Sequence, residues 1–307
     1  MECREKSLVI ILGPTGVGKS ATSIKLAKKL GGEIINCDSM QVYRGFDIGT
    51  DKLTPDERED IPHHLLDIAD AGTQFTAADF AKLALKAINL IPKKKKLPII
   101  VGGTGLYLKA LLDGLFPGPS GSSRLRFKLE KEAQEKGLES LAEKLKKIDP
   151  EYYQLIGRND KMRIIRALEV YELTKKPISE QFLNTKSYLE GLHIIKIGLT
   201  LTRSDLYKRI EERVDKMFKK GIIKEVESLL ERGVDETSPP FRALGYKYVL
   251  KYLKEEMSLE EAISLTKRDT RRYAKRQLTW FRKMEGIHWF SPFDFSSLAS
   301  YVEKQLQ

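Results

Sequence analysis

The chain has 307 residues, of which 41% are hydrophobic and 32% charged, which argues against wholesale disorder and leaves room for a sizeable core. This length favours two domains, or one domain with a large insertion. The formal net charge of +11 favours a polyanionic partner, although an ordinary basic enzyme would show it too. The cysteines Cys3 and Cys37 form no metal or disulfide pattern, and no apolar stretch approaches membrane-spanning length, so we expect a cytoplasmic protein.

The first elements of the chain predict a parallel sheet. An apolar run at residues 8–12 predicts a buried strand, and apolar positions at helical spacing predict a helix over 19–30. The stretch EIINCDS at 33–39 predicts a second strand that ends at Asp38. Strand, loop, helix and strand in this order are typical of an α/β fold with a parallel sheet.

A helix is predicted over 76–90 and a solvated loop at 92–96, and residues 97–112 predict a strand, a glycine turn and a helix. The stretch 114–123 is dense in Gly, Pro and Ser and is the best candidate domain boundary. Beyond it the pattern is helical and highly charged until 193–202, which predicts a strand again.

Residues 11–20, ILGPTGVGKS, have the spacing of a phosphate-binding loop between a predicted strand and a predicted helix. In such a loop backbone N–H groups converge on phosphate oxygens, Lys19 adds a positive charge and Ser20 can ligate Mg²⁺. NTPases generally hold that Mg²⁺ with an Asp that ends a second apolar strand. Here the strand at 97–101 ends in GGTG, so the loop predicts a diphosphate site rather than specifically a nucleotide site.

Two groups after predicted strands are candidates for the same edge of the sheet. The turn around Thr104 could be a second anion-binding surface or a plain strand-to-helix turn. Asp38 could be a general base, a Mg²⁺-linked acid or a helix N-cap. The amide of Gln41 and the ring of Tyr43 could read and stack on a base, which favours the general base. His63 and His64 lack further ligands at metal spacing and are interpreted as surface or loop residues.

The most basic stretch is 267–283, with eight Lys or Arg and one Asp. On a helix, one stripe of Thr270, Ala274, Leu278 and Phe281 can pack on the core. The remaining faces would present basic side chains to phosphates, and the interleaved Tyr273 and Trp280 could stack on bases. A solvated amphipathic helix is the alternative, although such a face usually mixes both charges. Residues 161–172 repeat the pattern more weakly.

Six stretches in order closely resemble the tRNA dimethylallyltransferases, and the similarity covers nearly the whole chain. They are GPTGVGKS, NCDSMQVYRGFDIGT, VGGTGLYLKALLDGL, MRIIRALEVYE, RALGYKY and YAKRQLTWFRK. The resemblance implies transfer of a dimethylallyl group from dimethylallyl diphosphate to the N6 amine of the adenosine 3′-adjacent to the anticodon in tRNA. It also implies a P-loop NTPase-like core formed by residues 1–120 and 195–307 and a helical insertion domain at 121–194. We further expect a monomer that binds no membrane.

By the same resemblance, Asp38 takes the amine proton, while Thr104 and Arg126 position the reacting groups and the tRNA. The implied diphosphate ligands are Gly13, Pro14, Thr15, Gly16, Val17, Gly18, Lys19, Ser20 and Arg213, with Ser20 beside Mg²⁺. The implied tRNA contacts are Asp38, Ser39, Met40, Gln41, Thr104, Arg126, Met162, Arg163, Ile164, Ile165, Arg166, Arg242, Gly245, Tyr246, Lys247, Lys275, Arg276, Gln277, Trp280 and Arg282.

Three other functions share parts of this pattern. An isopentenyltransferase that acts on free adenine nucleotide would share the phosphate loop and Asp38, but would not need the basic helix. A small-molecule kinase fits the phosphate loop, but fits the glycine turn after residue 101 less well. A nucleic-acid-binding NTPase without transfer chemistry is the third alternative.

Overall fold

The computed structural model describes residues 6–116, 118–119, 121–182 and 185–307. The chain divides into two compact units: unit one comprises residues 1–111 and 189–307, and unit two comprises residues 112–188. Residues 117 and 120 of the expected boundary stretch lie outside the described residues. Each unit has its own core.

Unit one is built on a parallel sheet of six strands in the order β3-β2-β4-β1-β5-β6. The strands are β1 Ser7–Leu12, β2 Gly32–Cys37, β3 His63–His64, β4 Leu97–Gly102, β5 His193–Leu199 and β6 Ile287–Phe290. Every residue of β1, β2 and β4 is buried, as expected for central strands covered on both faces. The α/β prediction is therefore confirmed. Of the interpretation of His63 and His64 as surface or loop residues, the loop part was wrong, because both pair with β2; both are partly exposed.

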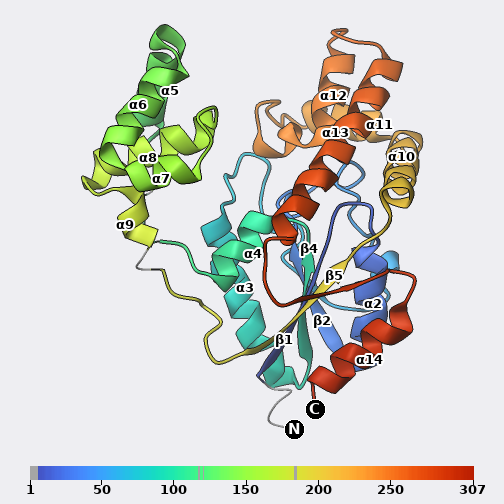
Figure 1. Cartoon of the computed structure of the whole chain (residues 1–307). Helices are drawn as coiled ribbons and strands as arrows, with labels where there is room; N and C mark the ends of the chain where they lie inside the picture. The colour runs from blue at the N-terminus through green and yellow to red at the C-terminus, as the bar shows by residue number, and fades with distance from the viewer. Residues whose placement is uncertain (1–5, 117, 120, 183–184) are drawn as a thin grey trace. The chain divides into compact units, whose positions relative to one another are not determined.

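Helices cover both faces of this sheet (Figure 1). The helices α2 Lys19–Leu30 and α14 Phe295–Gln305 pack on one face, where they share a core with β1, β4 and β5. The other face carries α3 Ala77–Leu90 and α4 Gly105–Leu112. The predicted helix over 76–90 is confirmed, and Thr76 and Asp79 form a capping box at its start.

The remaining helices of unit one are α10 Arg203–Lys220, α11 Ile222–Glu231, α12 Leu244–Leu253 and α13 Leu259–Phe281. Short 3₁₀ turns occupy Asp56–Arg58, Pro92–Lys94 and Pro239–Arg242. A second apolar cluster joins α11 and α12 to the segment that follows β2, with Phe46, Phe241 and Tyr246 packed edge to face. This cluster ties residues 42–69 to helices more than 150 positions later in the chain.

Unit two is helical in all its described residues that have regular structure. It contains α5 Ser123–Lys136, α6 Leu138–Ile148, α7 Pro150–Leu155, α8 Lys161–Thr174 and α9 Ile178–Phe182. Buried Asp149 accepts hydrogen bonds from Tyr152 N and from Ser179, and so joins the start of α7 to α9. In neither unit does any described helix combine the length and apolarity needed to cross a bilayer.

Candidate active site

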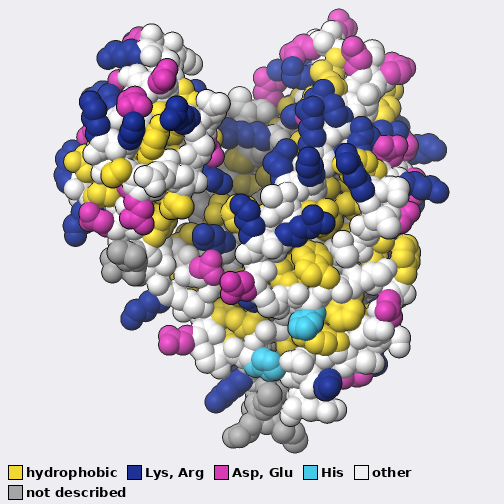
Figure 2. Space-filling model, in the orientation of Figure 1, with side chains coloured by type: hydrophobic (Ala, Val, Ile, Leu, Met, Phe, Trp, Pro, Cys, Tyr) yellow, Lys and Arg dark blue, Asp and Glu magenta, His cyan; other side chains and the backbone are white. Residues whose placement is uncertain are grey.

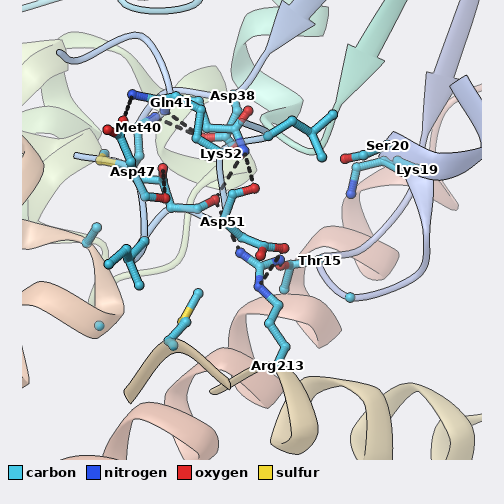
Figure 3. A pocket seen from close by; sticks show the side chains of 18 of the residues that line it. Thr15, Lys19, Ser20, Asp38, Met40, Gln41, Asp47, Asp51, Lys52 and Arg213 are labelled. Atoms are coloured by element: carbon cyan, nitrogen blue, oxygen red, sulfur yellow. Dashed lines mark hydrogen bonds and ion pairs between the residues drawn. The ribbon is translucent and has the colours of Figure 1, made fainter. Parts of the chain in front are cut away.

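A cavity of about 1020 Å³ lies in unit one at the carboxyl ends of β1, β2 and β4. Its walls come from the phosphate loop, the segment after β2, and helices α10, α12 and α13 (Figure 3). Because all the paired strands are parallel, the loops after them open at one edge of the sheet. Segments far apart in sequence therefore share one cavity.

The phosphate loop is curled by glycines and closed by its own lysine. Gly18 has a φ of 108°, and α2 begins directly after it. A Cβ at Gly13 would lie 2.7 Å from the carbonyl oxygen of Leu199, so only glycine lets the loop approach β5 this closely. Lys19 Nζ donates to the carbonyl oxygens of Gly13 at 3.0 Å and Pro14 at 2.9 Å. The result is a cradle of N–H groups at a helix N-terminus.

The electrostatics of the cradle suit an anion. Burial lowers the pKa of Lys19 to about 8, although the charge of Asp38 opposes that shift. Arg213, from α10, donates from Nη1 to Thr15 Oγ1 at 2.7 Å, as Figure 3 shows. Its Nε is buried and makes no hydrogen bond to any described residue, although Asp51 Oδ2 lies 3.3 Å away. A buried N–H without an acceptor is a group that an anionic ligand satisfies.

Asp38 follows β2 and lines the same cavity as Lys19. Its Oδ1 accepts from Met40 N at 2.8 Å and from Gln41 N at 3.3 Å, which closes a turn. The helix N-cap interpretation was wrong, because residues 39–42 form turns and no helix begins there. The general-base and Mg²⁺-linked interpretations both remain compatible with this position.

Thr104 fixes the turn that carries Asp38. Its Oγ1 accepts from Ser39 N at 3.1 Å, and its own N–H donates to Cys37 O at 3.3 Å. A Cβ at Gly102 would lie 2.0 Å from Cys37 O, so the glycine turn lets β4 and the end of β2 come together. The turn around Thr104 therefore positions its neighbours, whichever ligand the cavity binds.

Gln277 joins the two turns, a role that the sequence analysis missed. Its side chain is buried, with Oε1 accepting from Thr15 N at 2.9 Å and Nε2 donating to Gly103 O at 2.8 Å. The signal was available, because Gln277 lies three residues after Ala274, on the predicted apolar stripe of α13. Thr270, Ala274 and Phe281 are buried as that stripe predicted, whereas Leu278 is only partly buried.

The basic face of α13 is solvent-exposed at Arg272, Lys275, Arg276 and Arg282. Figure 2 shows Lys and Arg side chains gathered over this helix. Asp269, the single acid of residues 267–283, is held by its neighbours: burial opposes ionisation, but hydrogen bonds from Arg268 and Tyr248 bring its pKa to about 2. Asp269 is therefore ionised at neutral pH and is paired with Arg268 at 2.9 Å and with Arg272 at 3.6 Å, while Lys275 and Arg276 have no ion-pair partner among the described residues. Trp280 packs against Gly105, where a Cβ would lie 2.5 Å from its ring.

Several residues of unit one that were expected to contact tRNA are buried in the core or paired with other side chains. Tyr246 is fully buried and Gly245 is buried, so the Tyr246 ring is a core residue rather than a surface for RNA. Arg242 is exposed and lines the cavity, and Lys247 lies 3.4 Å from Asp269. The expectation of a side-chain contact with RNA is therefore corrected for Tyr246.

In unit two, Ile164 and Ile165 are core residues, which corrects the same expectation for their side chains. Met162 and Arg163 are exposed. Arg126 and Arg166 both pair with the fully buried Glu169, at 3.2 and 2.6 Å. Burial alone would raise the pKa of Glu169, but these two guanidinium groups and Ser122 N lower it. Arg126 thus has a structural partner within its own unit.

The oxygen donors in the cavity fit Mg²⁺ only together with a bound diphosphate. Ser20 is exposed at the start of α2, and it lines the same cavity as Asp38. The described residues contain no group of three or more His, Cys, Asp or Glu side chains that could hold a metal. An ion here would take most of its oxygens from a bound diphosphate and water, as Mg²⁺ does beside phosphates.

Comparisons with known proteins agree with this architecture. Residues 41–284 match the family model described as IPP transferase. The tRNA dimethylallyltransferase of Carboxydothermus hydrogenoformans is 52% identical over 93% of this chain and 92% of its own length. That of Acetivibrio thermocellus is 48% identical over 95% of this chain and 93% of its own length.

Two solved structures extend the likeness over 98% of this chain. A full-length tRNA isopentenylpyrophosphate transferase from Bacillus halodurans is 41% identical, with a TM-score of 0.72 and 97% of its chain covered. A eukaryotic dimethylallyltransferase described as acting on tRNA is 33% identical, with a TM-score of 0.79 and 77% covered. By the extent and identity of these matches, the chain belongs to the IPP transferase family, together with the tRNA dimethylallyltransferases.

Proposed function

We propose that this protein transfers the dimethylallyl group of dimethylallyl diphosphate to the N6 amine of the adenosine 3′-adjacent to the anticodon in tRNA, and releases diphosphate. The observation that carries the proposal is that Asp38 and Lys19 line one cavity at the end of the phosphate loop, in a chain of this family. We further propose that it works as a cytoplasmic monomer.

The diphosphate occupies the cradle of the phosphate loop. Lys19 turns from the carbonyl oxygens of Gly13 and Pro14 to the phosphate oxygens, and Arg213 supplies the second positive charge. Ser20 and the diphosphate would hold Mg²⁺, which would supply charge neutralisation of the leaving group. These groups stabilise the negative charge that grows on the diphosphate as it leaves.

Asp38 receives the proton of the attacking amine. The amine nitrogen forms a bond to C1 of the dimethylallyl group, and the C1–O bond breaks with its electron pair going to the diphosphate. An adenine amine is a poor nucleophile, so a carboxylate that removes its proton as the bond forms is useful. Thr104, through Ser39 N, keeps the turn that carries Asp38 in place.

The tRNA lies along the basic face of α13. The target base must leave its stack in the anticodon loop before it can enter the cavity beside Asp38. Tyr273, which lines the cavity, has its pKa raised by burial and then by the charge of Asp38, so it stays a neutral aromatic surface. The exposed Lys275 and Arg276 contact phosphates on either side of that base.

The test is to incubate the protein with Mg²⁺, radiolabelled dimethylallyl diphosphate and either unmodified tRNA or AMP. Label should enter tRNA, at the adenosine 3′-adjacent to the anticodon, and not AMP. Label in AMP would establish the free-nucleotide transferase instead. No label in either, with steady ATP turnover, would overturn prenyl transfer in favour of a kinase or an NTPase.

A further inference from the structure

The segment that contacts Arg213 at the wall of the cavity is also bonded to two side chains of other helices, the carboxylate of Glu225 and the phenol of Tyr246. We call residues 47–51 the clamp loop. Glu225, on α11, accepts from Asp47 N at 3.1 Å and Ile48 N at 2.8 Å through Oε2, and from Gly49 N at 3.4 Å through Oε1. Three successive backbone N–H groups thus converge on one side chain, as in an anion-binding nest.

Tyr246, on α12, completes this arrangement. Its hydroxyl donates to Glu225 Oε1 at 2.5 Å and accepts from Gly49 N at 3.1 Å. A Cβ at Gly49 would lie 2.5 Å from the Tyr246 ring, so the clamp loop lies directly on that ring. Burial and the charge of Glu225 raise the pKa of Tyr246, which keeps the hydroxyl protonated and able to donate.

On its other side the clamp loop contacts the groups proposed to bind and react. Thr50 O accepts from Arg213 Nη2 at 3.3 Å and from Gln41 Nε2 at 3.1 Å, and Asp51 Oδ2 lies 3.3 Å from Arg213 Nε. Figure 3 shows Asp51 and Arg213 pointing toward each other beside Thr15. The loop therefore connects the turn of Asp38 to the arginine at the phosphate loop.

The backbone of the clamp loop needs external support. Asp51 has a φ of 55°, a left-handed conformation that residues other than glycine adopt at a cost. Such a conformation persists only where surrounding contacts hold it. Glu225 and Tyr246 hold the start of the loop, and buried Lys52, which pairs with Asp47 and Asp67 at 2.6 Å, holds its end.

We infer that Glu225 and Tyr246 are positioning residues for the diphosphate site, acting through the clamp loop on Arg213. This inference rests on the proposed function, because Arg213 is taken as a diphosphate ligand. Without the hydrogen bonds to Glu225 and Tyr246, the clamp loop relaxes. Thr50 O and Asp51 then no longer hold the guanidinium of Arg213, and diphosphate binds more weakly. Neither side chain touches the substrate.

The test uses the full chain with Mg²⁺ and inorganic diphosphate, measured by isothermal titration calorimetry. Tyr246→Phe keeps the buried ring and removes only the hydroxyl, and Glu225→Gln removes one acceptor oxygen and the charge. We expect the diphosphate Kd to rise about fivefold to tenfold in Tyr246→Phe, and at least as much in Glu225→Gln. The KM for dimethylallyl diphosphate should rise more than the turnover at saturation falls.

Matched controls lie on the same helices. Tyr248→Phe removes a hydroxyl that donates to Asp269 at 2.5 Å, away from the clamp loop, and Glu227→Gln changes an exposed carboxylate. Both should leave the diphosphate Kd at the parent value, even where Tyr248→Phe lowers the melting temperature. An unchanged Kd in Tyr246→Phe, or an equal rise in Tyr248→Phe, would overturn the inference.

Failure of the proposed function is visible separately. A parent protein that transfers no label to tRNA would reject the reaction. The positioning role of Glu225 and Tyr246 would still be tested by diphosphate affinity alone, since that measurement needs neither tRNA nor turnover.

Discussion

The phosphate loop and the segment 38–51 face each other across one cavity but are held in different ways. The phosphate loop is closed by its own backbone and by Lys19, six residues or fewer from its acceptors. The segment 38–51 is held by Thr104, Arg213, Glu225 and Tyr246, all of them distant in the chain. The curl of the phosphate loop is encoded locally, although Gln277 and Arg213 also bond to its Thr15. The placement of Asp38 depends on tertiary contacts.

The largest effect is expected from Asp38→Asn, which changes the segment 38–51 and leaves the phosphate loop unaltered. Asn keeps the acceptor for Met40 N but cannot take a proton at neutral pH. Single-turnover transfer should fall by about 10²-fold or more, with tRNA affinity and melting temperature nearly unchanged. Asp56→Asn, in a short 3₁₀ turn, is the control and should retain parent activity. A near-normal rate in Asp38→Asn would place the base elsewhere.

The next largest effect should come from the basic face of α13, which lies outside both regions. Replacing Arg272, Lys275 and Arg276 by Gln should weaken tRNA binding, because fewer phosphates are then neutralised by the helix. The slope of log K against log salt should fall by about one for each phosphate that is no longer neutralised. Filter binding over a salt series measures the slope.

The control replaces Lys93, Lys95 and Lys96 by Gln, which makes the same charge change in the exposed segment before β4. Its slope should equal that of the parent. Equal slopes in the two triple variants would move the tRNA surface away from α13.

The phosphate loop itself can be tested by pH. Lys19 must be protonated to pair with diphosphate, and its pKa in the free protein is about 8. A bound anion raises that pKa, so affinity is fully present below about pH 8 and is lost as pH rises above it. The diphosphate Kd should rise by up to about tenfold per pH unit above that point.

Calorimetry from about pH 7 to about pH 9.5 at fixed Mg²⁺ spans the titration and measures this change. In Lys19→Arg the side chain stays charged throughout, so the Kd should stay flat over this range. A diphosphate Kd that stays constant over this pH range in the parent would show that Lys19 keeps its proton even without a ligand.

The smallest effect should come from Thr104→Val, which weakens the support of Asp38 without touching the phosphate loop. Val keeps the size of Thr but loses the acceptor for Ser39 N. A lost hydrogen bond of this kind is worth about 0.5–1.5 kcal/mol, so single-turnover transfer should fall by at most about tenfold. The diphosphate Kd should not move. A rise in that Kd would show that loosening the turn of Asp38 also disturbs the diphosphate site.

Much of the fold could be read from the chain because it rests on local periodicity. Apolar runs predicted β1 and β4, and the helix predicted over 76–90 is α3, whose capping box the structure shows. The two-residue strand His63–His64 was missed, since it has no apolar run and forms only through pairing with β2. Likewise Ile164, Ile165 and Tyr246 stand within stretches that resemble tRNA contacts, and only packing shows that their side chains belong to cores.

The phosphate loop is specified by local sequence, since glycines with positive φ, one lysine and a helix start lie within a few residues and their geometry needs little else. The sequence also determined the parallel strands that bring Asp38 to the same edge as that loop. The way in which Asp38 and Arg213 are held depends instead on contacts between distant parts of the fold. Gln277 bonds to the phosphate loop and to the glycine turn, and Glu225 and Tyr246 bond to the clamp loop, which contacts Arg213. All three lie on helices that are distant in the chain, and hydrogen bonds between such residues depend on packing rather than on spacing.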